Sequence, residues 1–370
     1  LSEGELWRRQ RRMYQRAFRK GTVQAMIDTM ADSVEGLIRH WESHASQTTD
    51  VLDDAMRLAL SIVSRTLISR DIGGFGAQDD ADAVALGKAF DEAVHEVGAR
   101  TLDLNPLAPY LPTQRNRSFA RTMALIDRLI GQVISARRAQ PVDSIDLLGE
   151  LMALRDEESG ETISDELLRD ELLNILLAGR GTSALGLCWM WWLLDQHPEI
   201  ERAVRAEVLS VLGPTARPTA ETLDQLTLTA RVFQESLRLY PPIWTIARQA
   251  TEDDELGGLR IKAGTIVLIS PFVIHRHPEL WPDPERFDPD RFLPHAVETR
   301  DRLAWMPFGA GPRVCVGGGF ALQEARIITA MVSRRFRLRS LPQAAPPEPE
   351  PLITLKPKGG LKMLIEPVSS

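Results

Sequence analysis

Residues 308–317 read Phe308-Gly309-Ala310-Gly311-Pro312-Arg313-Val314-Cys315-Val316-Gly317, and this loop carries the clearest chemistry in the chain. A cysteine binds a metal as its thiolate, which requires a setting that lowers its pKa. Backbone N–H groups of a glycine-rich loop that opens a helix near Phe320 supply such a setting, and Arg313 adds a cation close by. We therefore interpret Cys315 as a candidate metal ligand.

Three other positions of the loop fit a flat ligand beside the sulfur. Gly311 and Gly317 let the backbone pass close to such a ligand, because they carry no Cβ. Phe308 can shield the sulfur from water. The alternative interpretation is a loop with a buried structural cysteine, which is what most single cysteines are.

Composition limits the classes of protein to which the chain can belong. Lys and Arg number 44 against 51 Asp and Glu, a net charge of −7, which argues against a nucleic-acid-binding surface. Two cysteines are too few for a disulfide framework, so we expect a reducing, cytoplasmic setting. The longest apolar run, Ala184 to Leu194, is shorter than the ~18 residues of a membrane span, so we expect no span.

Apolar residues at three- and four-residue steps predict four long helices. The first runs from Val23 to Trp41 and the second from Phe119 to Arg138. Ser164 is a typical N-cap for the third and longest helix, which should end near Leu194. The fourth covers Leu228 to Leu239 and ends at a pair of prolines, which cannot continue it.

The sequence pattern changes after the fourth helix. Short β-branched runs between glycines predict a small sheet over Ala247 to Ile269. Two C-terminal runs, Leu352–Leu355 and Leu361–Ile365, should pair as a hairpin across Pro357 to Gly360. The fold class that follows is mainly α with a minor β part.

The loop around the cysteine resembles the haem-binding signature of the cytochrome P450 family. Its five fixed positions, Phe308, Gly311, Arg313, Cys315 and Gly317, all match. Five specified residues match by chance about once in several million windows at frequencies of roughly 1 in 20. The resemblance implies the P450 fold, a triangular helical domain with a long central helix and small sheets. It also implies haem b as the cofactor, with Cys315 as the axial iron ligand.

Two further motifs precede the cysteine in the order that the family shows. Glu235 and Arg238 would alone be an ordinary surface ion pair. They resemble the family's Glu-x-x-Arg, and the segment Phe287 to Phe292 resembles its companion, with Arg291 as the third member. The resemblance implies that the three side chains are structural and clamp the chain behind the haem.

Four residues are expected at the haem propionates. Trp7 and Arg11 resemble the family's Trp-x-x-x-Arg, whose side chains hold a propionate. Arg248 and Arg313 fall where the family places further partners, and the planar fork of arginine matches a carboxylate. The alternative for each arginine is a solvated side chain.

The middle of the longest helix departs from the family pattern. Ala178 to Ser183 resembles the oxygen-activation segment, with Gly179 and Thr182 in place, but Gly181 stands where an acid usually helps to deliver protons. Three explanations stay open. Water or a substrate group supplies the proton path, the enzyme uses peroxide, or the position is tolerant.

The substrate pocket is expected to be apolar. By resemblance it contains Ala178 on the long helix, then Ile243, Trp244 and Ile246 after the two prolines, and the tip of the terminal hairpin. The alternative for each of them is ordinary core packing.

The resemblance implies a monooxygenase of secondary metabolism that hydroxylates or epoxidises an apolar small molecule with O2. NAD(P)H would supply electrons indirectly, through a ferredoxin or flavodoxin type donor. We expect that donor at a basic stretch of the first helix, formed by Arg8, Arg9, Arg12, Arg16, Arg19 and Lys20. The alternatives are a peroxide-using enzyme, a haem-binding relative with poor turnover, and a helical interaction protein without haem.

The resemblance extends from Trp7 to the C-terminus. The family normally has a substantial region before its Trp-x-x-x-Arg helix, and that region brings strands and part of the pocket. We therefore expect one P450 domain over residues 1–370, without the usual N-terminal region.

Overall fold

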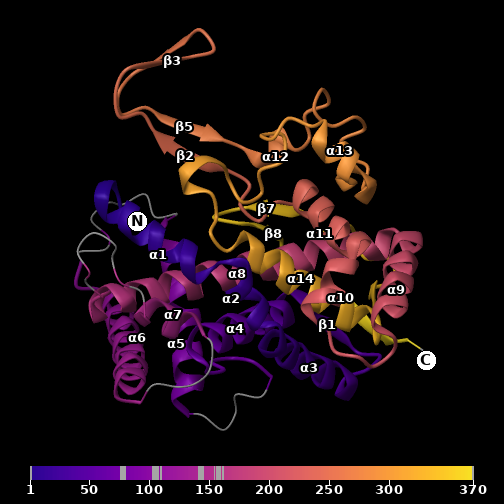
Figure 1. The fold of residues 1–370 in the computed structure, drawn as a ribbon, viewed down its shortest axis with the longest axis horizontal. Coiled ribbons are helices and arrows are strands. Elements are labelled where there is room, and N and C mark those ends of the chain that lie inside the picture. The colour runs from indigo at the N-terminus through magenta and orange to yellow at the C-terminus, as the bar shows by residue number, and fades with distance from the viewer. Residues whose placement is uncertain are drawn as a thin grey trace.

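The computed structural model describes residues 2–75, 81–101, 108, 111–140, 146–153, 155, 160 and 162–368. Helices make up most of it, with small sheets at its edges, as the sequence predicts (Figure 1). The helices are α1 (Gly4–Ala17), α2 (Lys20–Ala25), α3 (Ile27–Ser43), α4 (Val51–Ile68), α5 (Ala81–Thr101), α6 (Gln114–Ala139), α7 (Leu147–Ala153), α8 (Asp165–Gln196), α9 (Pro198–Leu212), α10 (Ala220–Gln225), α11 (Thr227–Leu239), α12 (Pro271–Ile274), η3 (Pro289–Phe292), α13 (Pro294–Glu298), η4 (Gly311–Arg313) and α14 (Gly318–Ser333).

Helix α8 is the centre of the molecule. The Ser164 hydroxyl accepts a hydrogen bond from the Leu167 backbone N–H at 3.2 Å and caps its first turn, as expected. The helix packs against α4, α6, α9 and α11 (Figure 1). By length and composition α8 could cross a membrane, but 56% of its most apolar window is buried inside the molecule. Its apolar character is therefore accounted for by the core.

The predicted first helix is divided in two. Met26 adopts φ −93° and ψ 1°, which ends α2 and starts α3. The apolar residues of the pattern are nevertheless buried on both sides of this turn, including Val23, Met30 and Trp41. The periodicity thus identified the buried face but not the bend.

The strands form one three-stranded sheet and three two-stranded ones among the described residues. Their bounds are β1 (Thr48–Asp50), β2 (Ile246–Gln249), β3 (Asp254–Leu256), β4 (Leu259–Ile261), β5 (Ile266–Ile269), β6 (Phe336–Ser340), β7 (Pro349–Pro351), β8 (Leu355–Pro357) and β9 (Lys362–Pro367). Strands β2 and β5 pair, and β3 and β4 form a hairpin that projects from the molecule (Figure 1). The predicted strands over Ala247 to Ile269 are therefore confirmed, but they form two separate two-stranded sheets and not one.

The predicted C-terminal hairpin is wrong. Strand β8 pairs with β7, whereas β9 lies between β1 and β6. Pairing with β6 places Leu338 beside Ile365, and both side chains are buried. This burial favours a distant partner over the neighbouring strand.

A buried ion pair joins α11 to the irregular chain that follows α12. Arg238 donates to both carboxylate oxygens of Glu235, at 2.7 and 2.8 Å, and both side chains are fully buried. Arg238 also donates to the carbonyls of His275, Pro284 and Arg286. Arg291 lies 3.5 Å from Glu235. The three predicted residues thus form one polar cluster.

The same cluster connects to the segment before the cysteine loop through His275. Burial lowers the pKa of this histidine to about 4, so its ring is neutral. Its Nε2 accepts the Met306 N–H at 2.9 Å, which leaves Nδ1 to donate to the Arg238 carbonyl at 3.1 Å. The position of residue 306 therefore depends on Arg238.

Truncation of this arginine should be costly. Arg238→Ala leaves Glu235 buried without its main partner, and we expect a loss of ~3–5 kcal/mol in the free energy of unfolding. Arg8→Ala is a matched control, because Arg8 and Glu5 also pair three residues apart but are 66% and 69% exposed. That variant should change stability by less than ~0.5 kcal/mol in urea denaturation. Equal effects in the two variants would contradict the role of the cluster.

Two glycines of α8 should respond oppositely to alanine. A Cβ at Gly179 would lie 2.8 Å from Cγ2 of Val63 on α4. A Cβ at Gly181 would have no neighbouring atom within 4 Å. Gly181→Ala should stabilise the helix by ~0.5–1 kcal/mol. Gly179→Ala should instead destabilise the protein by ~1–3 kcal/mol, because Val63 cannot move freely. Thermal or urea unfolding distinguishes them, and two stabilising substitutions would refute the close approach of α4.

Candidate active site

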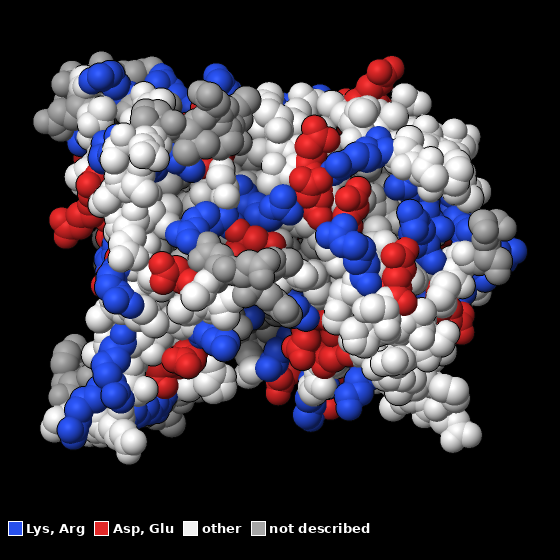
Figure 2. Space-filling model, turned by 90° about the horizontal axis from the view of Figure 1, so that it is seen from below, with Lys and Arg blue, Asp and Glu red and all other residues white. Residues whose placement is uncertain are grey.

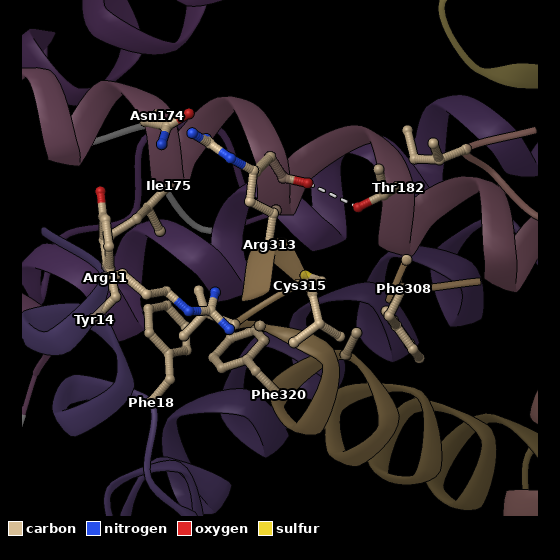
Figure 3. Close-up of a pocket in the computed structure, with 18 of the residues that line it drawn as sticks. Arg11, Tyr14, Phe18, Asn174, Ile175, Thr182, Phe308, Arg313, Cys315 and Phe320 are labelled. Atoms are coloured by element: carbon tan, nitrogen blue, oxygen red, sulfur yellow. Dashed lines mark hydrogen bonds between the residues drawn. The ribbon is translucent and has the colours of Figure 1, made fainter. Parts of the chain in front are cut away.

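A cavity of about 920 Å³ lies between α1, α8 and the loop that precedes α14. Its size falls near the upper end of the ~300–1,000 Å³ typical of ligand sites. Figure 3 shows side chains from these elements directed into it. Twelve of the residues predicted from sequence line it: Trp7, Arg11, Ala178, Gly179, Thr182, Ile243, Ile246, Arg248, Phe308, Arg313, Cys315 and Gly317. The chain thus brings together residues from both of its ends.

Backbone geometry presents Cys315 at the cavity wall. Its N–H donates to the Phe308 carbonyl at 2.8 Å and closes the loop. Gly309 and Gly311 both have φ +75°, a conformation that side chains rarely tolerate. Gly311 does not line the cavity, so its glycine is needed for the turn, not for ligand contact as we expected. The Phe308 ring lies beside Gly318, at the start of α14.

The environment of the sulfur differs from the expected one in one respect. Burial raises the pKa of the Cys315 thiol above its ordinary value. The backbone N–H groups of Gly317 and Gly318 lower it, as predicted, but by less. The cation that lowers this pKa is Arg11, not Arg313 as we expected. The loop alone therefore does not generate a thiolate. A metal cation deprotonates a coordinating thiol outright, so a cation bound here would complete this setting.

Gly317 keeps the space around the sulfur open. It lines the cavity, and a Cβ there would lie 3.9 Å from the Cys315 Sγ. Its φ of −82° is available to any residue. The absent side chain, not the backbone, is therefore what this position contributes.

The arginines predicted to bind the haem propionates differ in their hydrogen bonding. The Nε of Arg11 is buried and has no hydrogen-bond partner among the described residues. Arg313 donates to Glu3 at 2.6 Å and stacks over the ring of Trp7 at 4.5 Å, while Arg248 donates to the Ala247 carbonyl at 2.8 Å. An orphaned guanidinium nitrogen at a cavity edge fits a ligand carboxylate. These residues therefore fit haem.

The oxygen-activation segment lies on the cavity side of α8. Thr182 Oγ1 donates to the Ala178 carbonyl at 2.7 Å, one helical turn earlier (Figure 3). Gly179 is required by the close contact with Val63 of α4. Gly181 does not line the cavity.

One predicted pocket residue lies elsewhere. The Trp244 indole N–H donates to the Leu352 carbonyl at 2.8 Å, and the ring is not part of the cavity wall. The segment Pro357 to Gly360, where we expected the tip of the terminal hairpin, does not line the cavity either. An indole needs a partner for its N–H, and the nearby carbonyl supplies one.

Two acids at the site were not predicted. Glu171 lines the cavity, accepts from Gln10 at 2.5 Å, and has a pKa raised to about 7 by burial. Glu324 accepts from Ser183 at 2.6 Å, and burial raises its pKa to about 8. Glu324 follows Phe320 by four residues on the apolar face of α14. An acid at that spacing is the sequence signal that could have identified it.

Comparisons with known proteins agree with this geometry. A family model described as Cytochrome P450 matches residues 1–363. Cyclooctatin synthase of Streptomyces melanosporofaciens is 36% identical over 361 residues, which cover 97% of this chain and 76% of that protein. Cyclooctat-9-en-7-ol 5-monooxygenase of the same organism is 37% identical over 349 residues, covering 92% and 72%.

Solved structures show the same likeness. The cytochrome P450DA heme domain superposes with a TM-score of 0.90 at 28% identity, covering all of this chain and 79% of that one. The retinoic acid bound cyanobacterial CYP120A1 gives 0.86 at 27% identity, covering 99% and 80%. The chain belongs to the cytochrome P450 family and is a monooxygenase, an oxidoreductase whose cofactor is haem.

Proposed function

We propose that this chain inserts one oxygen atom from O2 into an apolar terpenoid molecule, with Cys315 as the iron ligand. The observation that carries the proposal is the arrangement of Cys315 and Thr182 on opposite elements around one largely apolar cavity. Two relatives are named cyclooctatin synthase and cyclooctat-9-en-7-ol 5-monooxygenase, and pentalenene oxygenase of Streptomyces avermitilis is 32% identical over 337 residues. These names support a terpenoid substrate.

Each part of the cavity contributes to this activity. When bound, haem supplies an iron centre whose thiolate ligand tunes its reactivity with oxygen and electrons. Cys315 would hold the iron, and the unpaired Nε of Arg11 would bind a propionate. Trp7, Arg248 and Arg313 would complete the propionate contacts. These roles follow from the positions of the side chains and the chemistry of their donors.

The substrate side of the cavity is apolar. Ala178, Ile243 and Ile246 line it and would exclude water from the reacting carbon. Glu171 and Gln10 add a polar pair at another part of the wall. A hydrocarbon with one hydroxyl group suits such a mixed lining.

An acidic electron donor would dock near α1. Arg8, Arg12 and Arg16 recur every four residues and so share one face of this helix. On the face shown in Figure 2, by contrast, acidic and basic side chains lie interspersed. Charge complementarity favours a ferredoxin or flavodoxin type donor that takes its electrons from NAD(P)H.

Gly181 favours one second candidate, a peroxide-using enzyme. No acid stands immediately before Thr182, and peroxide already carries the protons that such an acid helps to deliver. The two candidates share the cofactor and the substrate and differ only in the oxidant.

Turnover of a defined terpenoid tests the proposal. Haem-loaded protein with a ferredoxin and its reductase should convert cyclooctat-9-en-7-ol to a product that contains one oxygen atom from labelled O2. Thr182→Ala should lower the product formed per electron pair, whereas Arg202→Ala, on the exposed surface of α9, should not. Product with peroxide alone would establish the second candidate. No product with either oxidant would leave a haem-binding relative without turnover.

A further inference from the structure

The cavity is polar at the end where the first part of α8 lines it. Gln10 and Tyr14 line it from α1, where they lie one turn apart. Glu171 and Asn174 line it from α8, where they lie three residues apart, so each pair shares one face of its helix. Figure 3 shows the Tyr14 side chain extending from α1 toward Asn174 and Ile175 of α8. We call Gln10, Tyr14, Glu171 and Asn174 the polar end of the cavity.

The polar end has hydrogen-bonding capacity that the described residues do not use. Glu171 is 5% exposed, and its Oε1 accepts from the Gln10 side chain at 2.5 Å. Its Oε2 has no hydrogen-bond partner among the residues that the structure describes. The Tyr14 hydroxyl is also buried without a partner in the described part of the chain. Unpaired buried polar groups are costly, so this end of the cavity suits a ligand that carries a polar group.

The haem does not account for Glu171. A propionate is an anion, so a neighbouring carboxylate repels it, whereas the cation of Arg11 attracts it. Asp170 also lines the cavity, but it is paired with Arg169 at 2.5 Å. Among the described residues no cation pairs with Glu171: burial raises its pKa to about 7, opposed only by the hydrogen bond from Gln10. Its carboxyl group is therefore left for another ligand in the same cavity.

A hydroxyl group fits the polar end better than an ammonium group does. A hydroxyl both donates and accepts hydrogen bonds, so it can donate to Glu171 Oε2 and accept from the Asn174 amide. An ammonium group has three donors and no acceptor, so the Asn174 N–H groups would find no partner in it. The cation of Arg11, which directly follows Gln10 in α1, also disfavours a second positive charge at this end.

We propose that the substrate already carries a hydroxyl group, which donates to Glu171 and accepts from Asn174. The inference rests on the proposed oxygenase function and names its substrate class, a terpenoid alcohol. Glu171 and Asn174 precede Thr182 by eleven and eight residues, about 16 and 12 Å along α8 at ~1.5 Å per residue. The anchored oxygen and the oxidised carbon therefore lie at opposite ends of the substrate. Such a substrate must come from an earlier hydroxylation, or from a cyclisation that ends with the capture of water.

A purely structural role for Glu171 is the competing explanation, because its bond with Gln10 also ties α1 to α8. Glu171→Gln keeps an oxygen that accepts from Gln10 but replaces the free acceptor with a donor. Gln10→Ala breaks the tie and leaves the carboxyl group. Glu166→Gln is the matched control, since Glu166 is an exposed acid of the same helix that does not line the cavity.

Isothermal titration calorimetry of the haem-loaded protein tests the anchor without turnover. The two ligands are cyclooctat-9-en-7-ol and the hydrocarbon of the same skeleton without its hydroxyl group. Wild-type protein and Glu166→Gln should bind the alcohol at least ~10-fold more tightly, because a hydrogen bond to a buried carboxylate is charge-assisted. Glu171→Gln should lose most of this preference while its affinity for the hydrocarbon stays unchanged. Gln10→Ala should keep the preference.

Three binding results would overturn the anchor. They are an equal loss of affinity for both ligands in Glu171→Gln, loss of the preference in Gln10→Ala, and an amine of the same skeleton that binds more tightly than the alcohol. If Glu171→Gln does not fold, Asn174→Ala decides, because Asn174 is exposed and its amide is the proposed donor. That variant should weaken alcohol binding and leave hydrocarbon binding unchanged.

The position of oxygenation is a second readout. With the ferredoxin system, wild-type protein should oxidise the alcohol at one carbon, because the anchor fixes the orientation of the substrate. Glu171→Gln should give a mixture of positional isomers, and an unchanged single product would contradict the anchor. If wild-type protein binds both ligands equally well and oxygenates both, the anchor is wrong and the oxygenase stands. If it gives no product and no cysteine-dependent carbon monoxide spectrum, the proposed function fails, and this inference fails with it.

Discussion

The position of the cysteine loop depends on the buried pair formed by Glu235 and Arg238. Arg238 holds the carbonyl of His275, and the His275 ring accepts the N–H of Met306. Met306 in turn accepts the Gly309 N–H, and Cys315 donates to Phe308. The pair therefore fixes the backbone that leads to the sulfur, even though its side chains are far from the chemistry. A buried pair is a weak source of stability, but its loss is costly, so it suits this positioning role.

Local patterns predicted α3, α6, α8 and α11 but missed α4, α5 and α9, and non-local pairing explains the wrong strand partners. The cap at Ser164 and the helix that follows it depend on neighbouring residues, which the sequence displays. The partner of β9 depends on strands that lie far away in the chain, and β9 alone does not specify them. Trp244 was misplaced for a similar reason, since its carbonyl partner is Leu352.

Family motifs identified individual residues of the site, and the structure places most of those residues at one cavity. Cys315, Arg11 and Thr182 line one cavity because the family pattern is tied to that geometry. Patterns did not reveal why each glycine is present: Gly179 accommodates Val63, whereas Gly181 faces open space. They also missed Glu324, whose side chain is buried against Ser183 on another helix. Such a contact exists only in the folded chain, so the residues next to Glu324 in the sequence do not reveal it.

The central claim is that Cys315 is the ligand of a haem iron, and one spectrum tests it most directly. Reduced, haem-supplemented protein should give with carbon monoxide the strongly red-shifted absorption band of thiolate-ligated haem. Cys315→Ala should lose that band, because no other described cysteine lines the cavity. Wild-type protein that binds no haem, or a band that persists in Cys315→Ala, would contradict the account.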